Sequence, residues 1–117
     1  MTTQEIANRL VELCREGKNL QAYEELFSED AIAIEPVHTG IPDAIGKAAM
    51  IEKQEMMAMM IMEMHGMGVS DPLVSGKFFS CAMWIDAEML GRERSKLEEI
   101  AVYQVEDGKI VKEMFFF

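Results

Sequence analysis

The chain contains few of the residues that build covalent scaffolds or common catalytic motifs. Its 117 residues include two cysteines, two histidines, three prolines and one tryptophan. Cys14 and Cys81 stand far apart and form neither a disulfide framework nor a zinc motif, so we expect two reduced core thiols, as is usual in the cytoplasm. No Gly-rich phosphate loop and no Ser-His-Asp signature is present, so the sequence supports neither phosphoryl transfer nor triad hydrolysis.

Positive charge is also scarce. Eleven Lys and Arg stand against 21 Asp and Glu, which gives a net charge of −10. Residues 1–60 carry 5 basic and 11 acidic groups, and residues 61–117 carry 6 and 10, so the excess is spread evenly rather than confined to a tail. A surface of this kind repels phosphate groups, and we therefore expect no nucleic-acid partner and no anionic membrane partner.

Long hydrophobic runs are missing too. No stretch of about 18 uncharged apolar residues exists, and residues 1–6 lack the basic and apolar regions of a signal peptide. Half of the residues are nevertheless hydrophobic, which is enough to build one core. We expect a single domain over residues 1–117, located in the cytoplasm.

Three helical patterns occupy the first half of the chain. Thr2 and Glu5 form a capping box in front of an amphipathic pattern that Gly17 can end. Asn19 can cap a second short helix. Its inward side chains are expected to be Leu20, Tyr23, Leu26 and Phe27. A third helix is predicted to begin within residues 43–47 and to run into a stretch rich in methionine.

Extended patterns occupy the rest. Residues 31–35 read as a strand stopped by Pro36, and further strands are predicted at 62–69, 78–88, 97–105 and 110–117. Asp107-Gly108 favours a two-residue hairpin turn, because both residue types tolerate positive φ. The predicted fold class is therefore α+β, with two helices, a strand and a third helix before a four-strand antiparallel meander.

Three stretches carry a resemblance to a known superfamily: residues 11–20 with 26–31 and the Glu35-Pro36 strand end, the Gly46-Lys-Ala-Ala segment, and residues 98–116. In order and length they resemble the SnoaL-like superfamily, also called nuclear-transport-factor-2-like or ketosteroid-isomerase-like. The resemblance implies a cystatin-like α+β barrel, in which three N-terminal helices pack on a curved, mostly antiparallel sheet. It also implies a cone that encloses an apolar pocket. Its members include isomerases, cyclases, hydrolases and dehydratases, and also non-catalytic binding modules, so the fold alone does not decide the activity.

The resemblance also suggests site residues. Ketosteroid isomerases place their general base immediately before a proline at the end of the first strand, and Glu35-Pro36 occupies that place here. Their oxyanion hole uses a tyrosine of the first helix and an acid of the sheet. Glu99 falls near the acid, but Leu10 stands where the tyrosine belongs, so half of that hole is missing. This departure argues against steroid isomerisation.

Strand alternation gives an independent reason to consider the sheet acids. Leu97, Glu99, Ala101, Tyr103 and Val105 share one face of their strand, and the resemblance turns this face and Glu113 toward the pocket. An apolar environment raises the pKa of a carboxyl group toward the range useful for acid–base chemistry. Structural alternatives remain open: Glu35 can face water, Glu99 can pair with Arg94 or Lys112, and Glu113 can pair with Arg9.

The histidines are the remaining titratable candidates. His65 is expected to share a strand face with Met67 and Val69, where it can be a hydrogen-bonded core residue or the acid–base partner of Glu99. His38 lies in a loop that would border the pocket mouth. Asp86 interrupts an apolar strand, and a β-bulge could turn it inward.

Methionine is unusually abundant, and seven of the 12 methionines lie between Met56 and Met67. Thioethers suit copper(I), but methionine also fills irregular cavities and adaptable interfaces. We expect a soft pocket wall, with no metal and no cofactor.

Two functional hypotheses follow. In the first, the protein is a cofactor-independent enzyme of the isomerase, cyclase or hydrolase type that acts on a small apolar compound, with Glu99 and His65 as the acid–base pair and Glu35 as a second base. The expected pocket lining is Tyr23, Phe27, Met60, Met83, Tyr103, Glu113 and Phe115. In the second, the same fold is a non-catalytic ligand-binding or dimerisation module. In either case the outer sheet face, with Trp84 and the terminal phenylalanines, predicts a homodimer.

Overall fold

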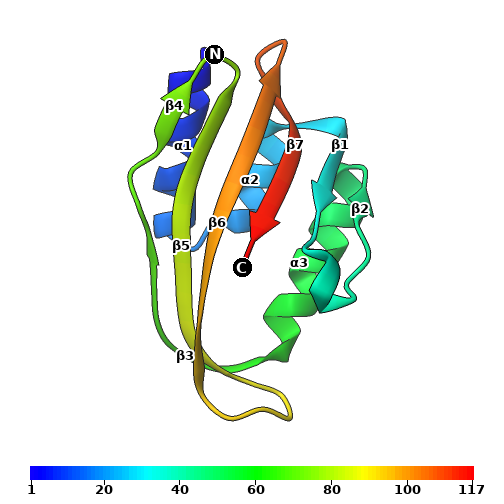
Figure 1. Ribbon diagram of the computed structural model, residues 1–117, viewed down its shortest axis with the longest axis vertical. Coiled ribbons are helices and arrows are strands. Elements are labelled where there is room, and N and C mark those ends of the chain that lie inside the picture. Colours follow the sequence, from blue (N-terminus) through cyan, green and yellow to red (C-terminus); the bar gives the residue numbers. More distant parts are fainter.

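The computed structural model describes all 117 residues, which form three α-helices and seven strands. The helices are α1 (Thr3–Arg15), α2 (Asn19–Leu26) and α3 (Lys47–Met60), and a 3₁₀ turn covers Val37–Thr39. The strands are β1 (Phe27–Ile34), β2 (Ala44–Ile45), β3 (Ile61–Val69), β4 (Leu73–Ser75), β5 (Phe78–Met89), β6 (Ser95–Glu106) and β7 (Lys109–Phe116). Figure 1 shows the three helices against one face of the curved sheet.

All seven strands belong to one sheet, with the order β2-β1-β7-β6-β5-β3 and with β4 paired to β5. Strands β3, β5, β6 and β7 are antiparallel neighbours, as the sequence predicts. The pairing of β1 with β7 is parallel, and it joins the first strand of the chain to the last. The predicted α+β class, with three helices on a mostly antiparallel curved sheet, is confirmed; the sheet is mixed and does not close.

Local signals fix several element ends. Thr2 and Glu5 form both hydrogen bonds of the capping box, at 3.1 Å and 2.9 Å, which satisfies two backbone N–H groups at the start of α1. The turn between β6 and β7 holds Asp107 at φ 49° and Gly108 at φ 75°. Both lie in the left-handed region that a two-residue hairpin of this kind requires, so the predicted turn is confirmed.

The second helix differs from its prediction. Lys18 is the N-cap residue and Asn19 is already helical, so Asn19 does not cap the helix. Leu20 points outward and is 42% exposed. Phe27 has extended backbone angles and opens β1, although its side chain is buried as expected. The buried residues of the helix are Ala22 and Leu26, and Leu20 lies two residues, or about 200°, from Ala22, which places it on the opposite side of the helix.

The core lies between the inner face of the sheet and the helices. Tyr103 of β6 stacks on Phe79 of β5 with ring centroids 4.7 Å apart, and Phe27 meets Tyr103 edge to face at 6.3 Å. Ile6, Leu10 and Leu13 of α1 belong to the same cluster of buried side chains. These large aromatic contacts fix how the helix layer sits on the sheet.

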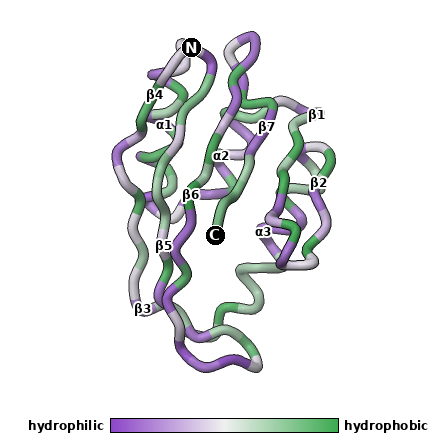
Figure 2. Tube along the Cα trace, in the orientation of Figure 1, coloured by the Kyte–Doolittle hydropathy of each residue, from purple (hydrophilic) through white to green (hydrophobic).

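The methionine-rich stretch spans the junction of α3 and β3. The hairpin between β5 and β6 reaches beyond the helices at the bottom of Figure 1. Figure 2 shows the methionine stretch in pale green as it descends from α3 into this region. Its members are largely exposed, from 36% at Met67 to 81% at Met59. None of the three helices combines the length and apolarity needed to cross a bilayer.

Candidate functional site

Glutamates from three different strands form the candidate site on the inner face of the sheet. Glu113 of β7 lies opposite Tyr103, Glu99 of β6 lies opposite Met83, and Glu35 directly follows β1. Glu99 and Tyr103 have the same strand parity, so both side chains project from the face that carries the core. The charge of Glu35 raises the pKa of both other glutamates, which shows that the three share one electrostatic environment.

Glu113 is the only residue with an ionisable carboxyl group among the buried residues, and 4% of its surface is exposed. Burial raises the pKa of its carboxyl group to about 8, and the charge of Glu99 adds to this rise. Hydrogen bonding to Tyr103 and Tyr23 acts in the opposite direction, and the Tyr23 hydroxyl donates to Glu113 Oε1 at 3.4 Å. The suggested pairing of Glu113 with Arg9 is wrong, because Arg9 binds Glu25 and Glu12 on the helix surface.

Glu99 is half-buried and has neither an ion-pair partner nor a side-chain hydrogen bond. Burial raises the pKa of its carboxyl group to about 7, and the charge of Glu35 contributes. The alternative of a surface pair with Arg94 is wrong, because Arg94 binds both carboxylate oxygens of Asp86 at 3.0 Å and 2.9 Å. Asp86 is therefore a surface ion-pair residue and does not turn inward. Glu99 is therefore an unpaired carboxyl group whose pKa lies near neutral pH.

Glu35 does not face water, because only 8% of its side chain is exposed and Lys53 of α3 forms an ion pair with it. Its backbone N–H donates to Asp43 Oδ1 at 3.0 Å, which holds the strand end against the following loop. Sequence reasoning missed Lys53. The available signal was helical spacing, since Lys53 follows the buried Met50 by one turn and so projects from the same face of α3.

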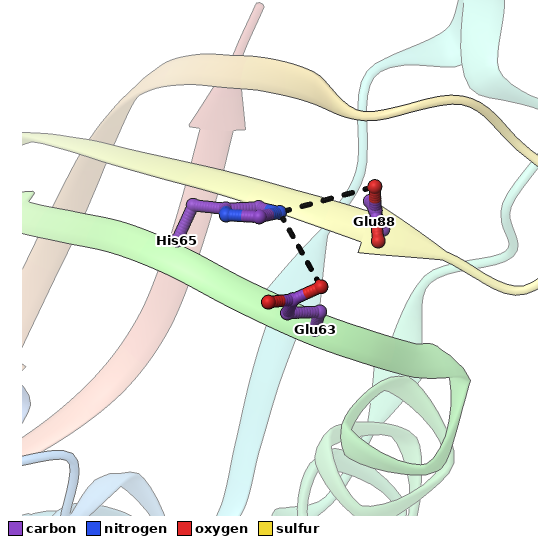
Figure 3. A group of neighbouring side chains, drawn as sticks. All are labelled: Glu63, His65 and Glu88. Atoms are coloured by element: carbon purple, nitrogen blue, oxygen red, sulfur yellow. Dashed lines mark ion pairs between the residues drawn. The ribbon is translucent and has the colours of Figure 1, made fainter.

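His65 does not lie with Glu99, and its predicted strand face is wrong. The pairing of β3 with β5 shifts register between Met64 and Gly66, so that His65 is the extra residue of a β-bulge. A bulge reverses the alternation on one side of it, and the imidazole consequently lies beside Glu63 and Glu88 (Figure 3). His38 lies in the 3₁₀ turn, with its ring 5.8 Å from that of Phe117.

The residues predicted to line a pocket fall into three groups. Phe27 and Tyr103 are fully buried in the core. Tyr23, Met83 and Phe115 are partly exposed and pack against that core, and Glu113 lies within it. Met60 ends α3 and is 42% exposed. Tyr23, which donates to Glu113, and Met83, which lies opposite Glu99, are the lining residues that combine contact with an acid and partial exposure.

The inner face is open on the side of Glu99 away from the core. Met67, Ile85 and Leu97 are paired across β3, β5 and β6, on the same face as Glu99. Met67 is 36% exposed and Leu97 is 43% exposed, because the helices do not reach this end of the sheet. Glu99 thus lies between a buried aromatic core and an accessible apolar wall.

Two hollows are present in the surface, and one of them borders Glu99. One of about 440 Å³ borders α1 and the loop before β4, and is lined mainly by polar residues such as Arg15 and Asp71. The other, of about 260 Å³, lies over β5 and β6, and its lining includes Glu99 and Met83 as well as Trp84, Ile100 and Phe116. Neither contains the buried acid Glu113.

The two cysteines are free thiols, as expected. Burial raises the pKa of Cys14 to about 11 and that of Cys81 to about 12. A thiol is a nucleophile or a metal ligand only when it is deprotonated, so both cysteines act as small apolar core residues at neutral pH.

The fold agrees with a comparison of the sequence with known families. The chain matches the SnoaL-like domain family over residues 1–117, and it belongs to that family. A search of curated proteins found no match.

Solved structures support the same assignment. A protein from Mesorhizobium loti, described as a candidate SnoaL-like polyketide cyclase, is 30% identical, and each chain covers 100% of the other with a TM-score of 0.93. A cystatin-like protein of unknown function from Xanthomonas campestris is 21% identical, with 99% and 90% coverage and a TM-score of 0.80. A ketosteroid-isomerase-like protein from Catenulispora acidiphila, solved with trimethylamine, is 15% identical, with 99% and 87% coverage and a TM-score of 0.75. The last two show the fold alone.

Proposed function

We propose that the protein is a cofactor-independent acid–base enzyme that acts on a small, mostly apolar compound with an acidic C–H bond beside a carbonyl or similar group. The observation that carries this proposal is Glu99, an unpaired carboxyl group with a pKa of about 7 beside an open apolar wall. A base with a pKa near the working pH is present in its ionised form and still accepts a proton readily.

The neighbouring groups have separate roles in this proposal. The Glu99 carboxylate removes the proton from carbon and later returns it to the product. Glu113, with a pKa of about 8, is mostly protonated at neutral pH and can donate a hydrogen bond to the oxygen that gains negative charge, while the Tyr23 hydroxyl donates to Glu113 Oε1. Glu35 forms an ion pair with Lys53, so it does not act as a base on the substrate. Its charge instead raises the pKa of Glu99.

The family assignment supports the reaction class. The Mesorhizobium loti relative is described as a candidate polyketide cyclase, and a neighbour from Pseudomonas putida, 18% identical, carries a similar description. Cyclisation of a polyketide begins with removal of a proton from carbon next to a carbonyl, which is the step that Glu99 would perform. Partners of this chemistry are small apolar molecules.

The Kemp elimination of 5-nitrobenzisoxazole tests the proposal without the natural substrate. In this reaction a base removes one proton from carbon, the N–O bond breaks, and a coloured cyanophenolate forms. The rate should rise with pH around a midpoint of about 7, because only the ionised form of Glu99 accepts a proton. E99Q should lower the rate by about 10²-fold or more.

The matched control is E98Q, which neutralises the adjacent glutamate on the opposite strand face, where 72% of the side chain is exposed. It should retain the wild-type rate. Equal rates for E99Q and wild type, with the circular dichroism of both unchanged, would remove Glu99 from the mechanism.

A second candidate function, a non-catalytic ligand-binding or dimerisation module, is favoured by the outer sheet face. Trp84 of β5, Ile100 of β6 and Phe116 of β7 lie on neighbouring strands and are 37%, 51% and 56% exposed. A continuous apolar surface on a sheet suits a second copy of the chain. Sedimentation velocity at high micromolar concentration should show a homodimer, and a monomer at that concentration would contradict this assembly.

A further inference from the structure

The outer edge of the sheet carries a cluster that acid–base chemistry on the inner face does not use. Glu63 and His65 of β3 and Glu88 of β5 direct their side chains toward one another (Figure 3). His65 Nε2 lies 3.9 Å from Glu63 Oε2 and 4.0 Å from Glu88 Oε1. One ligand atom from each residue can be chosen so that all three lie within 4.8 Å of one another.

The register of the β3–β5 pair gives a second reason to expect a cation beside Glu63 and Glu88. Glu63 and Glu88 are direct partners in the β3–β5 ladder. Like charges directly opposite each other destabilise an antiparallel pair. The charges of Glu63 and Glu88 help to raise the pKa of Arg94, but the side-chain hydrogen bonds of Arg94 go to the two carboxylate oxygens of Asp86. Neither glutamate has another ion-pair partner, and the distances to His65 are too long for hydrogen bonds.

We propose that Glu63, His65 and Glu88 bind a divalent transition-metal ion of the Zn²⁺ type. A neutral imidazole and two carboxylates form a donor set that such ions accept, with bonds of about 2.0–2.2 Å. Donor atoms on one tetrahedral ion lie roughly 3.4 Å apart. The two distances from His65 must shorten by about half an ångström and the distance between the two carboxylate donors by at most about 1.4 Å, and rotation of the exposed glutamate side chains provides this.

The bulge is the structural cause of the site. Glu63 and His65 share a strand face through their spacing of two residues, and the register shift turns that face away from Met67 and toward Glu88 of the neighbouring strand. A bound ion would tie β3 to β5 next to the exposed methionine stretch, and its three protein ligands would leave a position for water. No sequence motif marks this site, because Glu88 arrives from a separate strand.

Isothermal titration of the metal-free protein with ZnCl₂ tests the proposal. Wild type should bind one Zn²⁺ per chain, with saturation at micromolar concentrations, and the thermal unfolding temperature should rise with added metal. The ¹⁵N and ¹H resonances of the His65 ring should shift. H65Q should abolish binding, and E63Q and E88Q should each weaken it by at least about tenfold.

The chain offers a matched control, since His38 is the only other histidine. H38Q should bind Zn²⁺ as wild type does, and Mg²⁺ should not compete, because a hard cation has little affinity for imidazole. Unchanged affinity in H65Q, equal competition by Mg²⁺, or no saturable binding below millimolar Zn²⁺ would each overturn the site and leave only non-specific attraction to an acidic surface. Circular dichroism of the three exposed-site variants checks that their folds are retained.

Discussion

The two faces of the β-sheet hold carboxyl groups in opposite physical situations. On the inner face, Glu113 is 4% exposed and has a pKa of about 8 because it is buried among apolar and aromatic side chains. At the outer edge, the side chains of Glu63 and Glu88 are 62% and 43% exposed and lie opposite each other. Burial favours the protonated form of a carboxyl group, whereas an exposed carboxyl group is accessible to a cation. Substitutions that change one face and spare the other test this difference.

The largest effect on stability is expected at Glu113. Its pKa rises from 4.5 to about 8 on folding, so the folded protein retains a proton that the unfolded chain releases. The stability contributed by this group is full below about pH 4.5 and is lost as the pH rises through about 8. The total is on the order of 5 kcal/mol.

Urea unfolding from pH 5 to pH 9 measures this loss. E113Q should flatten the dependence, because glutamine stays neutral. The control E98Q, at an exposed position on the other face, should keep the wild-type slope. A slope in E113Q equal to that of wild type would mean that Glu113 is not the titrating group.

A smaller effect is expected at the Glu35–Lys53 pair. K53M leaves the 8%-exposed Glu35 side chain without its cation, which should lower the free energy of unfolding by about 2 kcal/mol. It should also raise the pH midpoint of the Kemp elimination, because the charge of Glu35 then acts on Glu99 without compensation.

The control for this pair is K96M, which breaks the exposed pair of Lys96 with Glu98 and should change stability by less than about 1 kcal/mol. The double variant K53M/E35Q should recover most of the stability lost in K53M, since it no longer buries an unpaired charge. Failure of the double variant to recover would indicate that the methylene chain of Lys53, rather than its charge, supports the site.

The smallest effect on folding is expected on the outer face. I100K adds a charge at a position that is 51% exposed, so the free energy of unfolding of the monomer should change by about 0.5 kcal/mol or less. The same substitution should abolish the dimer in sedimentation velocity, because the charge would be buried at the interface. A dimer that persists in I100K would place the contact elsewhere.

Much of the fold could be predicted from local sequence patterns. The capping box at Thr2 and Glu5, the hairpin turn at Asp107-Gly108 and the alternation of β6 depend on neighbouring residues, and each is found as predicted. Alternation also put Glu99 on the face of Tyr103 without any knowledge of the partners. The parallel pairing of β1 with β7 could not be predicted, because the residues of a strand do not indicate which distant strand will pair with it.

The candidate site could be predicted only in part, for the same reason. The sequence could mark Glu35, Glu99 and Glu113 as acids on apolar strands, but it could not assign Lys53 to Glu35, which required the packing of α3 against β1. His65 was misplaced because a β-bulge depends on the register between two strands, and one extra residue reverses which face a side chain occupies.

The sequence by itself determined an acidic α+β domain, its helix and strand order, and the inward face of β6, because periodicity and turn chemistry act over a few residues. Tertiary structure decided how far each acid is buried, which cation meets Glu35, and that Glu63 and Glu88 face each other across two strands. Those outcomes depend on distances between segments that are remote in the chain, and a pKa or a cation site is a property of such distances rather than of residue order.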